Sequence, residues 1–218
     1  MFDQITPLTV ALAVVGGVWG FASDRIATRW PEHEEGVEQR GLDWRTVVCV
    51  VIGGLALAAL PGRFDDTVQL ALFGGWFLAL TTLLATDLDQ RLLPDLITLP
   101  LIPLAAVAAL TGIDPLVHDS FGLIGAIAVA IVLPAGMYLL SIPFGPGAIG
   151  IGDLKLLVSV GLLSGLVRTV TGVVAGAFAA GIVIVVLLVA RRITLKSFIP
   201  FGPFLVLGAF WAVLVRFG

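Results

Sequence analysis

Long runs of apolar residues fill most of this 218-residue chain and constrain its fold more than any other feature. A helix that crosses a bilayer needs about 20 mostly apolar residues, and backbone in lipid must be helical or part of a closed barrel. The runs are too long and too continuous for the alternating pattern of barrel strands. We therefore predict an all-α integral membrane protein with about eight transmembrane helices, at residues 8–27, 45–60, 67–86, 96–113, 121–142, 154–167, 169–190 and 198–217.

The composition excludes a water-soluble globular protein. Of the residues, 59% are hydrophobic and 12% are charged, whereas soluble domains have about 45–50% apolar and about 25% charged residues. The net charge is −3 without a basic block, so the charge gives no basis for a nucleic-acid partner. One cysteine, Cys49, and two histidines offer no ligand cluster for zinc. We expect a single domain over residues 1–218, no metal, no other cofactor, and Cys49 as a small apolar filler.

Positive charges are divided unevenly between the two sides of this predicted bundle. Because cytoplasmic loops are enriched in Lys and Arg, we place the richer side in the cytoplasm and both termini outside. The richer side carries Arg25, Arg29, Arg40, Arg45, Arg91, Lys155, Arg191, Arg192 and Lys196, and the other side carries only Arg63, Arg168 and Arg216. The division between the sixth and seventh runs near Arg168 leaves seven spans, or a re-entrant segment, as alternatives.

Two polar clusters lie at predicted cytoplasmic ends of spans. The first, residues 85–95, follows the third run and contains Asp87, Asp89, Pro94 and Asp95. The second, residues 147–157, opens the sixth run and contains Gly150, Gly152, Asp153 and Lys155. Ionisable groups in or at the edge of a membrane are costly and mark functional sites. Because both clusters are predicted on one side, their aspartates can meet.

A pair of carboxylates can hydrolyse a peptide bond without a metal or a nucleophilic side chain. Two carboxylates about 3 Å apart cannot both ionise, so one serves as base and the other as acid. Asp153 begins a predicted helix, where the helix dipole favours the anion, and Asp87 ends one. We therefore predict Asp153 as the base and Asp87 as the acid, although a coupled pair titrates jointly and leaves the reverse assignment open. Gly150 and Gly152 allow a substrate strand to approach closely.

Each cluster alone also fits an ordinary structural role. Asp87 and Asp89 fit a solvated loop before a helix that begins at Pro94. The Gly-x-Gly-Asp sequence at residues 150–153 fits a helix start capped by its aspartate. The occurrence of both clusters on one predicted membrane face favours a site over two separate structural features.

The sequence Ile-Pro-Phe-Gly-Pro occurs twice, at residues 142–146 and 199–203. Pro143, Gly145, Pro200 and Gly202 interrupt helices, and the unpaired backbone groups are tolerated in a membrane only where they are buried in protein or line a wet cavity. We predict that both segments edge one cleft, with two ordinary helix ends as the alternative.

Three motifs, in order, resemble those of the type IV prepilin peptidases. Residues 87–95, followed by Thr98-Leu99-Pro100, are similar to the family's first aspartate motif. Residues 150–156 resemble its G-x-G-D-x-K-L motif, and residues 199–205 resemble its C-terminal signature. The resemblance covers about residues 67–217, which is most of the chain.

This resemblance implies an aspartic endopeptidase of the cytoplasmic membrane. Such enzymes remove a short basic leader from type IV prepilins, or from pilin-like secretion, competence or archaellin subunits, at the cytoplasmic membrane face. The catalytic aspartates map onto Asp87 and Asp153, the loop glycines onto Gly150 and Gly152, and the motif's lysine onto Lys155. The implied partners are a prepilin or pilin-like precursor as substrate and the lipid bilayer, with no oligomeric state implied.

The chain departs from the family pattern after its first helix. Many bacterial members also N-methylate the new amino terminus, with a cysteine-rich insert at this place. Here residues 28–44 form a short loop without cysteine, which we expect to be a solvated connector. We therefore expect cleavage without methylation and without zinc.

Three alternatives remain on the sequence alone. A presenilin-like intramembrane protease also uses G-x-G-D, but it is expected to have a Tyr-Asp pair where this chain has Thr86-Asp87. A proton-coupled transporter could use the same aspartates as a relay, in which case they are expected near the middle of broken helices. A structural scaffold leaves the two aspartates unexplained.

Overall fold

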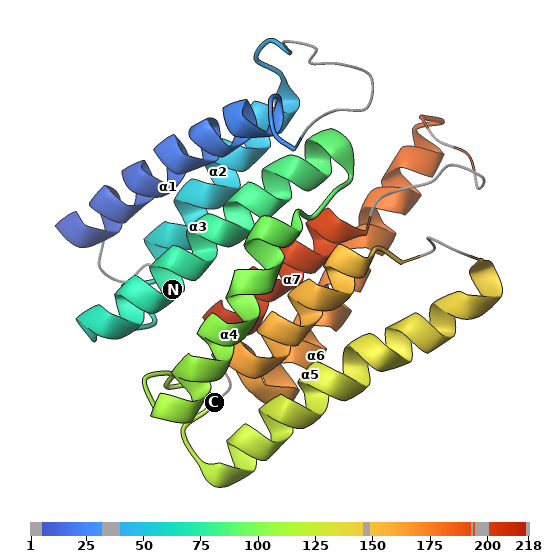
Figure 1. The fold of residues 1–218 in the computed structure, drawn as a ribbon. Helices are drawn as coiled ribbons and strands as arrows, with labels where there is room; N and C mark the ends of the chain where they lie inside the picture. The colour runs from blue at the N-terminus through green and yellow to red at the C-terminus, as the bar shows by residue number, and fades with distance from the viewer. Residues whose placement is uncertain (1–5, 32–39, 146–148, 193, 195–200, 217–218) are drawn as a thin grey trace.

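The computed structural model describes residues 6–31, 40–145, 149–192, 194 and 201–216, and the ordered elements in these ranges are helices (Figure 1). The predicted all-α fold is confirmed. The elements are α1 (Pro7–Ala27), α2 (Trp44–Ala59), α3 (Thr67–Gln90), α4 (Asp95–Thr111), α5 (Ser120–Ser141), the 3₁₀ turn η1 (Ile142–Phe144), α6 (Ile151–Val189) and α7 (Gly202–Leu214).

Aspartates in the loops start three of these helices. Asp43 accepts the backbone N–H groups of the first turn of α2, Asp66 those of α3, and Asp119 that of Gly122 in α5. A carboxylate at this position satisfies donors that have no partner inside the helix. The helix starts are therefore set by short polar signals between the apolar runs.

Four helices, α1, α3, α5 and α6, are long and apolar enough to cross a membrane, by length and composition. Large apolar side chains cover much of the outer surface, including Phe121 and Phe178, which are 83% and 72% exposed. An apolar exterior of this extent suits lipid rather than water. These features support a multi-pass membrane protein, while the count of eight spans and the outside placement of both termini stay predictions.

Helix α6 corrects the predicted division between the sixth and seventh runs. The backbone of Gly165 has φ 73° and ψ 177°, so the helical conformation is interrupted there rather than near Arg168. Glycine takes this conformation without the strain that a Cβ atom brings. Before the break, Gly161 lies against α5, and after it Gly172 lies against the backbone of Gly208 in α7.

The second part of α6 runs antiparallel to α7. Gly172 faces Gly208, and four residues later Gly176 faces Phe204. Gly202, at the start of α7, lies against the carboxyl group of Asp87 near the end of α3. One end of the bundle holds Asp87, Gly202 and the starts of α4 and α6, and we call it the Asp87 end (Figure 1). The opposite end holds the start of α3 and the last turns of α2 and α7.

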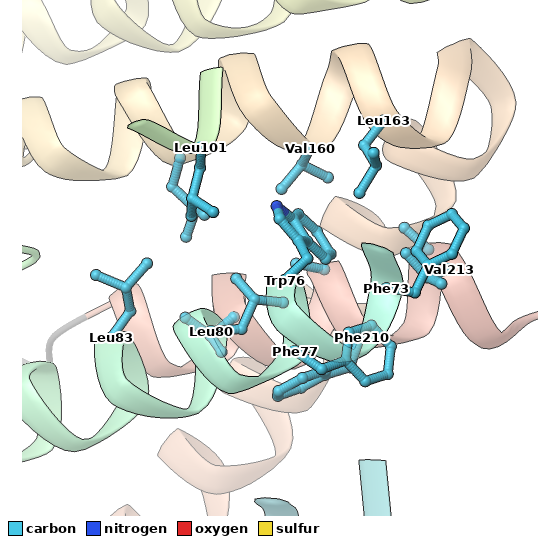
Figure 2. Close-up of a cluster of buried hydrophobic side chains, with 14 of the residues drawn as sticks. Phe73, Trp76, Phe77, Leu80, Leu83, Leu101, Val160, Leu163, Phe210 and Val213 are labelled. Atoms are coloured by element: carbon cyan, nitrogen blue, oxygen red, sulfur yellow. The ribbon is translucent and has the colours of Figure 1, made fainter. Parts of the chain in front are cut away.

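A continuous apolar core holds α3, α6 and α7 together (Figure 2). Phe77 of α3 and Phe210 of α7 pack edge to face with ring centroids 4.8 Å apart. The other buried members labelled in Figure 2 are Phe73, Trp76, Leu80, Leu83, Leu101, Val160, Leu163 and Val213. Cys49 is also buried, against Ala27 and Ala85, as predicted for an apolar filler. Packing of this kind fixes the positions of the helices that carry Asp87, Asp153 and Gly202.

Candidate active site

Asp87 lies in the last turn of α3 and is 4% exposed. The predicted run ends at residue 86, which would place Asp87 after the helix. The helix instead continues to Gln90, so Asp87 is part of it. Arg91 ends the helix in the left-handed conformation, with φ 56°, and its N–H donates to the backbone oxygen of Asp87 at 2.9 Å. This left-handed turn directs the chain from α3 into the segment that leads to α4.

Asp153 is the third residue of α6, which begins at Ile151 rather than at the predicted residue 154. The carboxylate accepts a hydrogen bond from the backbone N–H of Gly150, the residue that precedes the helix. It therefore lies at the positive end of a helix dipole with a backbone donor directed at it. The helix dipole and the backbone donor favour the carboxylate anion, whereas burial of the carboxyl group opposes it.

The two aspartates line one cavity of about 480 Å³ at the Asp87 end, and they are close enough to interact electrostatically. The predicted residues Pro94, Gly150, Gly152 and Lys155 line the same cavity. The complete lining is Asp87, Arg91, Leu92, Leu93, Pro94, Asp95, Gly150, Ile151, Gly152, Asp153 and Lys155. Residues from α3, the segment before α4 and the start of α6 thus meet in one place.

Two glycines allow the walls of this site to approach closely. A Cβ atom on Gly202 would lie 2.6 Å from the carboxyl carbon of Asp87. A Cβ atom on Gly152 would lie 2.8 Å from both the Cβ and the backbone oxygen of Leu93. Both distances are shorter than van der Waals contact allows, so neither position can carry a side chain without displacing the residue that it faces.

An ion pair crosses the mouth of the cavity. The Nζ atom of Lys155 donates to Oδ1 of Asp95 at 2.7 Å, and both side chains are partly exposed. An exposed pair of this kind contributes about 0–1 kcal/mol to stability. Its effect is therefore geometric, because it links the first turn of α4 to the first turn of α6.

Asp89, predicted as a supporting residue, does not line this cavity. Its Oδ1 atom accepts from Nη1 of Arg45 at 2.8 Å and lies 3.2 Å from Nε of Arg40. Asp24 of α1, which is 1% exposed, belongs to the same network and accepts from Arg40 at 2.6 Å and from Thr46 at 2.7 Å. Arg25 also pairs with Asp24.

The network was not predicted, although a signal was present: Asp24 lies inside the first apolar run. The part of residues 28–44 that the structure describes is also more than a solvated connector, since Arg40 is held by three carboxylates, those of Asp24, Asp43 and Asp89. Burial lowers the pKa of Arg40, but hydrogen bonds to Asp43 and Asp24 outweigh this effect and raise it.

The two Pro-Phe-Gly-Pro segments are placed differently. The second contributes Gly202 to the wall beside Asp87, while Pro200 lies outside the described residues. In the first, Pro143 is exposed, Gly145 has φ 93°, and neither lines the described cavity. A role of Pro143, Gly145 and Pro200 at the cleft stays a prediction.

The chemical character of the site follows from its donors and acceptors. Oδ2 of Asp87 is buried and has no hydrogen-bond partner among the described residues, whereas Asp153 receives a backbone N–H. Within the described ranges, no group of three His, Cys, Asp or Glu side chains is arranged to hold a metal ion. The arrangement can perform acid–base chemistry on a water molecule with two carboxyl groups in unequal environments.

Comparison with known proteins bears on this site. The type IV leader peptidase family matches residues 71–189, more than half of the chain. Three similar proteins are each named prepilin leader peptidase/N-methyltransferase. The one from Burkholderia pseudomallei (strain K96243) is 34% identical over 156 residues, which cover 72% of this chain and 50% of that protein.

The relative from Pseudomonas aeruginosa is 30% identical over 128 residues, covering 59% of this chain and 43% of the relative. The relative from Aeromonas salmonicida (strain A449) is 32% identical over 149 residues, covering 66% and 48%. This chain thus spans about half the length of these relatives. No solved structure matches it. On the sequence match over residues 71–189, which contain Asp87 and Asp153 of the cavity, the chain belongs to the type IV leader peptidase family.

Proposed function

We propose that this protein is a membrane-embedded aspartic endopeptidase that removes the leader peptide of type IV prepilins or pilin-like precursors. The observation that carries the proposal is the shared cavity of Asp87 and Asp153 in a chain of this family. The substrate class comes from the name of the relatives, prepilin leader peptidase. A cleft at the end of a helical bundle is accessible to a peptide that leaves the membrane there.

In the proposed reaction, Asp153 is the base and Asp87 is the acid. Asp153 takes a proton from water, the hydroxide oxygen bonds to the scissile carbonyl carbon, and Asp87 donates its proton to the carbonyl oxygen. Asp153 then protonates the leaving nitrogen, the C–N bond breaks, and Asp87 recovers its proton from the new carboxyl group. The backbone donor at Asp153 and the lack of a donor at Oδ2 of Asp87 support this order.

The glycines beside the aspartates are proposed to admit an extended peptide. Gly150 is exposed at the cavity, and Gly152 and Gly202 keep side chains away from Leu93 and Asp87. A backbone without side chains can approach a substrate strand closely enough to exchange hydrogen bonds with it. Lys155, paired with Asp95, is proposed to hold the two edges of this opening together.

The Asp87 end is proposed to face the cytoplasm in the cytoplasmic (inner) membrane. The ion-pair network of Asp24, Arg25, Arg40 and Arg45 lies at this end, and the loops there carry most of the basic residues. The excess of positive charge on cytoplasmic loops supports this orientation. The leader of a prepilin would then be cut where it enters the cytoplasm.

We also propose that the chain does not methylate its product. The relatives carry both activities in their name. A cysteine-free loop of residues 28–44 is far below the roughly 40 residues that a chain needs to fold without staples. Incubation of cleaved pilin with this protein and S-adenosylmethionine should leave the mass of the new N-terminus unchanged, and a methyl increment would contradict the proposal.

Co-expression with candidate prepilins tests the peptidase proposal. The mature N-terminus, read by mass spectrometry, should show loss of the leader with the wild-type chain and no loss with Asp87→Asn or Asp153→Asn. The matched control is Asp89→Asn, which lies outside the cavity and should keep appreciable activity. Asp95→Asn keeps both catalytic carboxyl groups but loses the ion pair with Lys155, so it should be slower than wild type and still appreciably active. Leader removal by either catalytic-site variant at the wild-type rate would end the carboxylate-pair mechanism.

The same aspartates suit a proton-coupled transporter less well. Asp87 lies in the last turn of α3 and Asp153 in the first turn of α6, whereas relay carboxylates are expected near the middle of a span. Vesicles containing the protein distinguish the two functions. Proton uptake that depends on Asp87 and Asp153, with prepilin left intact, would favour transport.

A further inference from the structure

Three arginines meet at the end of the bundle opposite Asp87. They are Arg63, Arg168 and Arg216, the only Lys or Arg residues that the predicted spans place on that side. Nε of Arg63 donates to the backbone oxygen of Val213 at 3.4 Å, and Arg168 donates to that of Val215. Part of this gathering has a structural cause, because the last carbonyl groups of α7 lack partners within the helix.

Arg63 and Arg216 also border a cavity of about 480 Å³. The remainder of its wall is mostly apolar and comes largely from α7, through Leu207, Phe210, Trp211 and Leu214. Trp211 is 51% exposed, so the cavity opens on the outer surface of the bundle rather than into its core. Capping of the α7 carbonyl groups does not require this apolar hollow.

The two arginines at the cavity are not neutralised by protein carboxylates in the described ranges. Arg63 contacts Val213 and stacks against Phe64, and Arg216 donates to the backbone oxygen of Gly62. Burial, together with the charge of Arg216, lowers the pKa of Arg63. Two guanidinium groups held near one another, one of them partly buried, attract an anion.

We propose that this cavity binds an anionic phospholipid, with its phosphate between Arg63 and Arg216 and an acyl chain along the apolar side of α7. Charge complementarity selects the headgroup, and the apolar wall selects a lipid over a soluble anion. Trp211, at the cavity wall, is of the residue type that is enriched at membrane–water interfaces, where phospholipid headgroups lie. This site lies at the other end of the bundle from Asp87 and Asp153 and does not depend on the proposed peptidase function.

Lipid binding by the purified full-length chain in neutral detergent tests the proposal. Native mass spectrometry with phosphatidylglycerol and with phosphatidylcholine of the same acyl chains should show at least tenfold tighter binding of the anionic lipid. The double variant Arg63→Gln/Arg216→Gln should lose this preference. Arg192→Gln, an exposed arginine after α6, is the matched control and should keep it.

Two further variants separate charge from folding. Arg63→Lys/Arg216→Lys keeps both charges and should retain most of the preference. Ala59→Phe places a larger side chain at the cavity wall while both arginines remain, and it should weaken binding of both lipids. If the glutamine variant does not fold, these two variants still decide the question.

Five results would overturn the proposal. Three of them are equal binding of the two lipids by the wild type, an equal loss of lipid preference in Arg192→Gln, and unchanged lipid binding in Ala59→Phe. The fourth is competition by glycerol phosphate as effective as by the lipid, which would assign the site to a soluble phosphate. A dimer that dissociates in the Arg63→Gln/Arg216→Gln variant, without lipid selectivity, would assign this face to a second copy of the chain.

Discussion

Asp87 and Asp89 lie two residues apart in the last turn of α3, but they face different surroundings. Asp89 faces Arg40 and Arg45, both within ion-pair distance of one of its oxygens. Asp87 faces Gly202, a cavity and the carboxyl group of Asp153, and its Oδ2 has no donor among the described residues. Residues two apart on a helix do not share a face, so one short segment serves both regions.

The difference shows how the same residue type takes two roles. In the network of Asp24, Asp89 and the arginines, each negative charge has a positive partner, and the result is a join between α1, α2 and α3. In the cavity, the charge of Asp153 repels that of Asp87 and Arg91 opposes this effect less strongly, so sharing a proton relieves the repulsion. The first arrangement holds helices together, and the second is the one for which we propose proton transfer.

The largest expected effect is on cleavage by the carboxylate pair. Asp87→Asn and Asp153→Asn each remove one proton-transfer group while preserving its shape, and they should reduce kcat/KM by about 10²–10⁴-fold or more. Cleavage of a prepilin by purified protein at equal concentration measures this. Asp89→Asn, at the arginine-bound position of the same turn, should stay within about tenfold of wild type. Equal losses at positions 87 and 89 would remove the distinction between the two regions.

A methyl group beside Asp87 should have the next largest effect. Gly202→Ala places a Cβ atom 2.6 Å from the carboxyl carbon of Asp87, so either α7 or the carboxyl group must move. A displacement of about 1 Å in a catalytic group costs on the order of 10²-fold in rate. Gly181→Ala, where a Cβ atom meets nothing within 4 Å, is the matched control. Wild-type rates in Gly202→Ala would show that the close approach does not position Asp87.

Asp24→Asn should change stability more than catalysis. It leaves Arg25 and Arg40 without their buried counter-charge, and breaking a buried pair costs about 3–5 kcal/mol, less here because both arginines are partly exposed. The apparent Tm in detergent should fall by about 5 °C or more. Cleavage measured well below that temperature should remain near wild type. A large loss of activity with unchanged Tm would place Asp24 in the reaction instead.

Run length located the helices well. The predicted segments 8–27 and 121–142 differ by one residue at most from α1 and α5, since a lipid-facing helix must be apolar along its whole length. The break in α6 was placed at the wrong residue. The chain has 26 glycines, and only packing against neighbouring helices decides that Gly165 takes a positive φ while Gly161 and Gly172 serve as contact points.

The cavity was predicted in part. Motif order and loop charge indicated that Asp87 and Asp153 lie at one end, and the structure brings both into one cavity. The partners of Asp24 could not be read from spacing, because Arg40 and Thr46 come from the far side of a loop and another helix. Gly202 was likewise predicted only to interrupt a helix. Its contact with Asp87 was not predicted, because it depends on how α7 docks on α3.

A third kind of buried carboxylate completes the comparison. Asp114, in the loop between α4 and α5, is fully buried. Its Oδ1 accepts the N–H of Leu116 at 2.8 Å, and its Oδ2, like that of Asp87, has no hydrogen-bond partner among the described residues. Burial raises the pKa of Asp114 to about 7, against smaller opposing effects of the Leu116 N–H and the charge of Arg168. Unlike Asp87, it does not line the Asp87–Asp153 cavity, and the charge that acts on it is that of Arg168, so we expect it to affect stability alone.

The smallest expected effect is therefore a pH dependence of the difference between Asp114→Asn and wild type. Because the folded protein holds the Asp114 proton up to about pH 7 and the unfolded chain only up to about pH 3.8, this residue's contribution to stability is full below pH 3.8 and is lost as the pH rises to 7. The asparagine does not ionise and keeps an oxygen for Leu116. The apparent Tm of the variant minus that of wild type should thus increase between pH 5 and pH 8, by about 2–4 °C for each kcal/mol of this contribution that is lost. Thermal unfolding in one detergent at both pH values measures it, and a difference that stays constant would mean that Asp114 does not titrate in this range.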